Sequence, residues 1–274
     1  MRAMLGAPAK IAPMARTERR ARSHEVESLA RVMAFLRVNL AKTADEARAI
    51  EAGYVVLTPS LPAVWSVNQV RVTLPLGFEP VVALAEEQLA GTPYVHIVLE
   101  NQEAGHELEQ AFRAAGWKAE REVLMLLSGE PDREADTSVV IDAGEDEVAE
   151  VMRRWYSEDQ LRAGELEQLT EFSRRESRAC GDRLLGVRSI DGALLAITKL
   201  RTAGNTAQVE DVYTTPEARG RGFARALVTR AVELARDGDH DVVFITADDN
   251  DWPKQLYARI GFRPLGRLWL FHHD

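Results

Sequence analysis

The residues best suited to chemistry form a short turn rich in glycine and arginine. They are Arg219, Gly220, Arg221, Gly222, Phe223, Ala224 and Arg225. Exposed backbone N–H groups and the positive end of the helix dipole make the start of a helix favourable for anions and unfavourable for cations. Arginines in such a place indicate a bound phosphate or pyrophosphate, which glycines let the backbone approach closely. For this motif alone, a solvated basic turn remains the alternative.

Two elements must position this turn. Residues 206–214 read as an apolar strand that runs toward Pro216, and the residues after the turn repeat apolar side chains at helical spacing. The apolar stripe consists of Leu227, Val228, Ala231, Leu234 and Ala235, while Arg225, Thr229, Arg230, Glu233 and Arg236 lie off it. The sequence therefore predicts a strand, a turn and a helix that packs on a sheet.

The rest of the second half supplies further strands and helices. We expect a strand at 138–142, helices around 148–155 and 166–172, and strands at 183–190 and 193–200 joined by a two-residue hairpin turn at Asp191 and Gly192. The apolar run within 239–247 predicts a central strand. An acidic loop at 248–251, a short helix from Pro253 to Gly261 and a last strand to Phe271 follow.

The first half has a similar alternation. It reads as a helix from His24 with Val26, Leu29, Met33 and Leu36 on its buried face, then strands at 54–58 and 67–73, a helix at 80–89, a strand at 94–99, a helix ending near Gly116 and a strand at 122–127. The polar segment around 128–136 is typical of a linker. We therefore expect a flexible basic tail at 1–22, domains at 23–128 and 137–274, and a linker at 129–136.

Composition limits the function classes. The chain has 274 residues and a formal net charge of -9, which disfavours general binding to nucleic acid. Cys180 is the only cysteine, so neither an intrachain disulfide nor a cysteine metal site is expected, as suits a reducing cytoplasm. His96 and His106 have no third ligand at metal spacing. No apolar run is long enough to cross a bilayer.

The second half resembles the GCN5-related N-acetyltransferase (GNAT) superfamily in several motifs that follow in order. The turn at 219–224 matches the family's Gln/Arg-x-x-Gly-x-Gly/Ala element, and the preceding strand and Pro216 are in place. Asn250 and Tyr257 stand seven residues apart, and Tyr257 is followed by Gly261 and Phe262 as in the family's Tyr-x-x-x-Gly-Phe element. The resemblance implies a mixed α/β fold of two GNAT-like domains, each a twisted mixed sheet flanked by helices.

The resemblance also implies a site for acetyl-CoA. Its pyrophosphate would lie on the amides from Gly220 to Arg225, and its pantetheine arm would pair with the backbone of Val212, Tyr213 and Thr214. Asn250 would reach that arm. An acceptor amine would attack the thioester directly, without a covalent enzyme intermediate and without a metal, which agrees with a lone Cys180.

Tyr257 and Glu210 are the expected catalytic residues. The resemblance places Tyr257 at the thioester sulfur. Because a phenol is a weaker acid than a thiol, full proton transfer from Tyr257 to the leaving thiolate is unfavourable by about 2 kcal/mol. We therefore expect Tyr257 to donate a hydrogen bond to the developing thiolate. Glu210 matches an acidic strand position of polyamine acetyltransferases. An ordinary carboxylate is about 6 pKa units too weak to deprotonate an alkylammonium efficiently, so Glu210 orients the amine, acts through water or is structural. Asp211, being adjacent, should point to the opposite face.

The first half resembles a repeat of the same fold that lacks the residues of the site. Asn101, Phe112, Gly116 and Trp117 stand where Asn250, Tyr257, Gly261 and Phe262 stand in the second half, and phenylalanine has no proton to offer. At the place of the phosphate turn, residues 73–80 contain one glycine and no arginine. We expect a degenerate domain that binds no cofactor, and one active site per chain.

Together these features predict an N-acetyltransferase whose substrate is a small-molecule or protein amine, acting as a monomer or homodimer. One alternative is a non-catalytic module that binds or senses acyl-CoA. Another is a structural or interaction protein in which both halves are vestigial.

Overall fold

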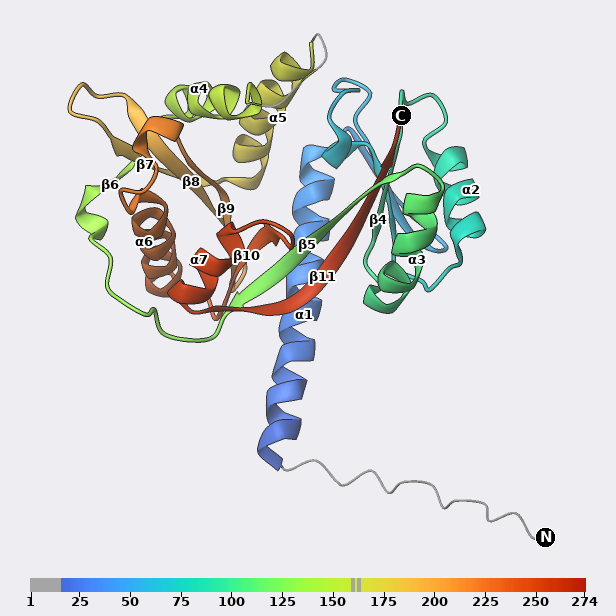
Figure 1. The fold of residues 1–274 in the computed structure, drawn as a ribbon, viewed down its shortest axis with the longest axis horizontal. Coiled ribbons are helices and arrows are strands. Elements are labelled where there is room, and N and C mark those ends of the chain that lie inside the picture. Colours follow the sequence, from blue (N-terminus) through green and yellow to red (C-terminus); the bar gives the residue numbers. More distant parts are fainter. Residues whose placement is uncertain (1–15, 159–160, 162–163) are drawn as a thin grey trace.

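Two runs of alternating strands and helices build the fold. The computed structural model describes residues 16–158, 161 and 164–274 (Figure 1). The first run comprises α1 (Arg16–Thr43), β1 (Glu46–Ile50), β2 (Gly53–Leu57), β3 (Gln69–Val72), α2 (Phe78–Gln88), β4 (Val95–Leu99), α3 (Gln102–Ala114) and β5 (Lys118–Leu127). The second comprises β6 (Val140–Asp142), α4 (Glu145–Tyr156), α5 (Glu165–Cys180), β7 (Arg183–Arg188), β8 (Leu194–Ala203), β9 (Thr206–Thr214), α6 (Phe223–Asp237), β10 (Val242–Asp248), α7 (Pro253–Ile260) and β11 (Phe262–His273).

All eleven of these strands join one mixed sheet. Its order is β1-β2-β3-β4-β11-β5-β10-β9-β8-β7-β6. The last strand of each half therefore lies beside the penultimate strand of the other half: β11 pairs with β4, and β5 pairs with β10. In Figure 1 these exchanged strands, green and red, run between the two halves. The expected α/β fold of two similar halves, each with helices on a twisted mixed sheet, is confirmed, and the two expected sheets are continuous.

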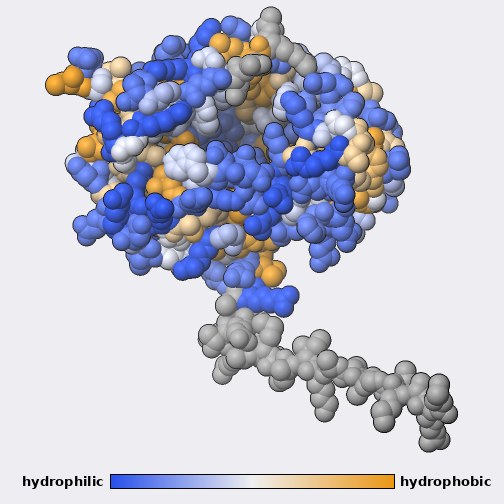
Figure 2. Space-filling view, in the orientation of Figure 1, coloured by the Kyte–Doolittle hydropathy of each residue, from blue (hydrophilic) through white to orange (hydrophobic). Residues whose placement is uncertain are grey.

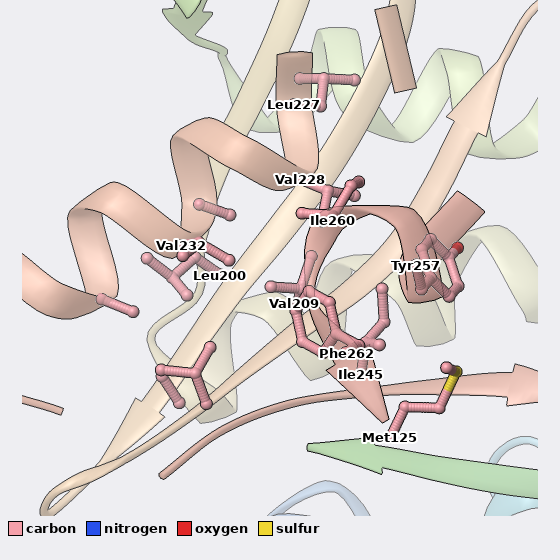
Figure 3. Packing of buried hydrophobic residues seen from close by; sticks show 14 of the residues in the cluster. Met125, Leu200, Val209, Leu227, Val228, Val232, Ile245, Tyr257, Ile260 and Phe262 are labelled. Atoms are coloured by element: carbon pink, nitrogen blue, oxygen red, sulfur yellow. The ribbon is translucent and has the colours of Figure 1, made fainter. Parts of the chain in front are cut away.

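Each half keeps its own apolar core on one face of the sheet. In the second half, α6 and α7 cover β7 to β10. Leu227, Val228 and Val232 of α6 belong to one buried cluster with Val209 and Ile245, and these residues are labelled in Figure 3. The first half has a matching core under α2 and α3 around Phe112, which stacks on Phe271 of the exchanged strand. The apolar stripe of α6 thus has the partner that its spacing predicts.

Helix α1 joins the two halves on the other face. It packs on β9, β10, β11 and α5, with Val32 and Phe35 against Phe244 and Leu268. The rings of Phe35 and Phe244 meet edge to face at 5.4 Å between centroids. This third cluster draws on residues of both halves, so α1 connects them by direct packing.

Several local expectations were wrong. Strand β1 was missed because four of its five residues are exposed and carry no apolar alternation. The first helix begins at Arg16 and not at His24, so the end of the expected tail segment is the lead-in to this helix, while residues 1–15 lie outside the described chain. Val26 is exposed, not buried. The β7–β8 ladder ends at Arg188 and Leu194, so residues 189–193 form a wider loop than the expected two-residue turn.

Candidate active site

The two parallel strands at the centre of the second half separate before they end. Strands β9 and β10 pair from Thr206 with Val242 as far as Val209 with Ile245. Both strands continue, to Thr214 and Asp248 respectively. Beyond Val209 the edge of β9 faces β10 with no ladder between them. The expected pantetheine segment, Val212 to Thr214, lies in this separated part.

A β-bulge in β9 produces the separation. Ile197 of β8 pairs with Tyr213, and Lys199 pairs with Glu210, so β9 contains one extra residue. Asp211 takes the left-handed conformation, with φ of 51°. Its carboxylate lies 2.7 Å from the ammonium of buried Lys199, which is paired opposite Glu210. The expectation that Glu210 and Asp211 point to opposite faces is wrong, because the bulge turns both carboxyl groups to one face.

Two buried hydroxyl groups border the separated strands without a hydrogen-bond partner among the described residues. They are Oγ1 of Thr214 on β9 and Oγ1 of Thr246 on β10. Most buried polar groups in proteins are paired, so such orphans at a strand opening are consistent with a polar ligand there. An extended amide-containing arm such as pantetheine offers the required donors and acceptors.

The side chains of Val212 and Tyr213 serve packing. Val212 packs against the core under α6. The ring of Tyr213 stacks on Trp155 of α4 at 5.1 Å, and its hydroxyl donates to Glu158. Burial and this hydrogen bond raise the pKa of Tyr213 to about 12. Any contact of these residues with a ligand in the opening would therefore use their backbone groups.

The glycine turn enters α6 in the conformation that the sequence suggested. Gly220 and Gly222 have φ of 77° and 84°, which disfavour other residues. Gly222 is the residue before the helix and offers no side chain to cap it, and the first turn carries no acidic residue. The first helical bond runs from the N–H of Ala226 to the carbonyl of Gly222. The N–H groups of Phe223, Ala224 and Arg225 are therefore free of helical bonds and can donate hydrogen bonds to an anion.

The three arginines of the turn behave differently. Arg219 is half exposed and contacts the carbonyl of Thr214 at 3.2 Å and the carboxylate of Glu158 at 3.2 Å. Arg221 is exposed and lies over the ring of Phe223. Arg225 was expected off the buried stripe, yet its side chain is buried and its guanidinium lies 2.8 Å from Asp132.

A cavity of about 260 Å³ adjoins the turn. Its wall combines Arg221, Gly222 and Phe223 with Arg133 and nearby residues of the segment between the halves. The segment at 129–136 therefore lies against the glycine turn and does more than connect the two halves. The wall carries three arginines, Arg133, Arg221 and Arg225, together with the acidic residues Glu134 and Asp136.

Tyr257 occupies the edge of the core beneath the separated strands. It is 5% exposed, and Figure 3 shows its hydroxyl pointing away from Val209 and Ile245. Burial raises the pKa of Tyr257 above its usual value, and the nearby carboxyl of Glu210 raises it further. The phenol therefore stays protonated near neutral pH and can act only as a hydrogen-bond donor or late proton source.

Glu210 is placed close enough to Tyr257 to influence it. Its carboxyl accepts a hydrogen bond from the amide of Gln208. Burial and then Asp211 raise the pKa of Glu210 well above its usual value. A carboxylate with a raised pKa is a stronger base than the ordinary one considered from sequence, so the obstacle to a base role is smaller than expected.

Asn250 lies in the turn at the carboxyl end of β10, the end at which β9 and β10 separate. Its side-chain oxygen accepts from Arg121 at 3.3 Å, and its N–H donates to Asp248. The neighbouring Asp249 is buried and pairs with Arg267 at 2.8 Å and with Lys254 at 3.0 Å. Asp249 is therefore held in buried ion pairs and not in a solvated loop, while Asn250 is exposed.

Sequence reasoning missed a second cavity, of about 180 Å³, onto which Glu210 opens. It lies between the two halves, where Figure 2 shows the surface hollowed. Gln208 and Glu210 on β9, and Arg201 on β8, contribute to its wall. The available signal was a set of polar residues at alternate positions of otherwise apolar strands, which indicates one polar face.

The first half lacks each of these site features. Its parallel strands β3 and β4 stay paired to their last residues, Val72 and Leu99, and the N–H of Glu100 extends the ladder. Helix α2 starts with Glu79 in its first turn, after Gly77 with an ordinary φ of -76°. Phe112 is fully buried at the place of Tyr257. Closed strands and an acidic helix start disfavour a phosphate-bearing ligand here.

Comparisons with known proteins agree with this architecture. Residues 147–262 match the family model described as the acetyltransferase (GNAT) family. No curated protein sequence matches the chain. A GCN5-related N-acetyltransferase from Kribbella flavida superposes with a TM-score of 0.56 at 17% identity, covering 93% of this chain and 95% of that one.

Two further structures share the fold. A functionally unknown conserved protein from Staphylococcus epidermidis has a TM-score of 0.61 at 13% identity, covering 84% of this chain and 94% of that one. A GCN5-related N-acetyltransferase from Sphaerobacter thermophilus has a TM-score of 0.50 at 15% identity, and the match covers 71% of this chain and 64% of that one. The family match thus covers residues 147–262 of the second half, and the first half is a degenerate domain of the same fold.

Neither a metal centre nor a membrane span is found in the described chain. Residues 16–158, 161 and 164–274 contain no group of three potential metal ligands. None of the helices in these ranges combines the length and the apolar character that crossing a bilayer requires.

Proposed function

We propose that the protein transfers an acetyl or short acyl group from acyl-CoA to an amine, at one site per chain in the second half. The observation that carries the proposal is the opening between β9 and β10, which leads to the uncapped start of α6 and lies beside Tyr257 and Glu210. Acyl-CoA, when bound, supplies the acyl group activated as a thioester.

The chain's own residues have separate tasks. Backbone N–H groups from Gly220 to Arg225 hold the pyrophosphate, and the backbone of Val212 to Thr214 aligns the pantetheine arm. Glu210 orients the acceptor and takes a proton from its ammonium form. Asn250, at the carboxyl end of β10, is a further contact to the arm.

Tyr257 acts at the leaving sulfur. The amine nitrogen forms its bond to the carbonyl carbon as the C–S bond breaks, and the hydroxyl of Tyr257 donates a hydrogen bond to the sulfur. The second amine proton ends on that sulfur, and Glu210 returns its proton to water. Cys180 takes no part, because burial raises the pKa of its thiol to about 11.

Amine-dependent release of CoA thiol tests the proposal. Incubation of the full chain with acetyl-CoA and a panel of small amines and amine-bearing peptides should release thiol in proportion to acylated amine. Binding of acetyl-CoA with no thiol release for any amine would instead support a non-catalytic acyl-CoA sensor, and the absence of any binding would support a purely structural role.

A further inference from the structure

The 180 Å³ cavity between the two halves takes its wall from both of them. The second half contributes Arg201, Gln208 and Glu210, and the first half contributes Arg71 and His96. Glu122 belongs to β5, the strand that the first half places beside β10. The degenerate half therefore supplies part of a polar pocket next to the proposed active site.

Two carboxyl groups of this wall form no ion pair with a described residue. Arg201 is satisfied by Asp182 at 2.8 Å and Glu176 at 3.1 Å, and Lys199 is paired with Asp211. Glu122 and Glu210 form no such ion pair. Burial raises the pKa of both carboxyl groups, and Glu122 raises that of Glu210 further, while Arg71 partly offsets the rise at Glu122. A ligand ammonium between these two groups would supply the missing positive charge.

On the first-half side of the cavity, the guanidinium group of Arg71 lacks a hydrogen-bond acceptor for one of its nitrogens in the described chain. Arg71 is 8% exposed, and its Nε lies 2.7 Å from Glu100, while its Nη2 is buried and has no hydrogen-bond partner in the described chain. Glu100 is shared with Arg37 at 3.6 Å, so two guanidinium groups face one carboxylate. The surplus positive charge and the orphan donor favour a ligand oxyanion.

Two neutral groups support a ligand in this place. Oε1 of Gln69 and Nδ1 of His96 line the same cavity and are also buried without a partner in the described ranges. Burial and nearby positive groups lower the pKa of His96 to about 3, so its ring is neutral and adds no charge. With Oε1 of Gln208, four buried polar groups around this cavity have no hydrogen-bond partner in the described chain. Native cores leave few buried polar groups unpaired, so this number favours a bound polar ligand.

We propose that this cavity binds the acyl acceptor as a small zwitterion, an amine that also carries a carboxylate. The ammonium lies between Glu122 and Glu210, beside Tyr257, and the carboxylate takes a hydrogen bond from Nη2 of Arg71. This assignment rests on the acyl-transfer function proposed above and gives the degenerate half a task in substrate recognition.

Matched acceptors test the assignment on the full chain. Norleucine is compared with pentylamine, which lacks its carboxylate, and with norleucinamide, in which the carboxylate is an uncharged amide; 6-aminohexanoate and hexylamine form a second pair with a longer spacing. Direct binding is measured by calorimetry without acetyl-CoA, and kcat/KM is measured by thiol release. At least one amino-carboxylate should exceed its matched amine by about tenfold or more in both assays.

Variants separate the two ends of the ligand. Arg71→Met should reduce kcat/KM for norleucine about tenfold more than for pentylamine, chiefly through KM, and Arg71→Lys should recover part of the loss. Glu122→Gln should weaken both acceptors alike. Arg37→Met is the control, because Arg37 also pairs with Glu100 but does not line the cavity.

The outcomes are distinct from those for acyl transfer itself. Equal affinity for the amino-carboxylates and their matched amines, or an equal effect of Arg71→Met on both, would overturn the zwitterion assignment while acyl transfer stands. Failure of acetyl-CoA to bind would overturn the acyl-transfer function, and selective calorimetric binding of an amino-carboxylate would still establish the pocket.

Discussion

At the scale of single residues, burial determines what Tyr257 and Glu210 can do. Both have a pKa raised by burial, and the carboxyl of Glu210 raises that of Tyr257 further. Their types and positions were predictable from sequence, because Tyr257 precedes Gly261 at the spacing of a known element. Their protonation behaviour was not predictable, because it depends on the bulge that brings Asp211 to the same face as Glu210.

Replacing Tyr257 tests its role at the sulfur. Tyr257→Phe removes the hydroxyl and keeps the ring in the core, so kcat should fall about 10²-fold while acetyl-CoA affinity is retained. Steady-state kinetics and calorimetry measure the two effects. Tyr94→Phe is a matched control, since Tyr94 is also buried but lies in the first half. An unchanged kcat would remove Tyr257 from the mechanism.

Replacing Glu210 tests both its function and its effect on stability. Because its pKa is raised in the folded state, Glu210 favours folding below its ordinary pKa, and this contribution is lost as pH rises toward the folded pKa. Glu210→Gln should therefore become more stable relative to the natural chain as pH rises through that window, while kcat falls about 10²-fold. Urea denaturation at several pH values measures the first effect. A difference in stability that does not vary with pH would contradict the raised pKa.

At the scale of elements, the sequence predicted those whose apolar pattern is regular. Strand β9 and helices α6 and α7 were found where periodicity placed them, because one face of each packs on a core. Strand β1 was missed because its exposed side chains show no such pattern, and the bulge in β9 leaves no trace in residue types. The cavity was missed because its wall comes from strands far apart in the sequence.

The buried ion pairs of Arg201 on β8 with Glu176 on α5 and with Asp182 should contribute more to the free energy of unfolding than exposed ion pairs do. Arg201 is 6% exposed and pairs with Asp182 and Glu176. Arg201→Met leaves the buried carboxylate of Asp182 without an ion-pair partner, while Glu176 keeps Lys199, and should lower the free energy of unfolding by about 3–5 kcal/mol. Arg183→Met removes an exposed pair with Asp142 and should lower it by less than about 1 kcal/mol. Chemical denaturation measures both. An equal decrease in the free energy of unfolding for the two variants would show that the buried ion pairs stabilise the fold no more than the exposed pair does.

At the scale of the whole molecule, strand exchange makes the two halves one folding unit. The sequence predicted two similar halves, and that prediction holds for their fold. It could not predict that β5 and β11 change places, because an apolar strand pattern specifies a buried face but not the neighbouring strand. The same exchange puts Glu122 of the first half beside the proposed site of the second.

Unfolding experiments test this coupling. Neither half has its full set of strand partners without the other, and α1 packs on both, so the chain should unfold in a single cooperative transition. Residues 137–274 expressed alone should not give the same stable fold, because β10 loses β5 and β11 loses β4. Two separate calorimetric transitions, or an independently stable second half, would contradict the coupling.

The most direct test of the central claim is calorimetric titration of the full chain with acetyl-CoA. The open β9–β10 pair and the glycine turn in the second half, against the closed β3–β4 pair in the first, predict one site per chain. Gly222→Glu should abolish that site by placing negative charge at the start of α6, whereas Gly222→Ala, which carries the same backbone strain and no charge, should retain more affinity. A stoichiometry of two, no binding, or full affinity in Gly222→Glu would contradict the account.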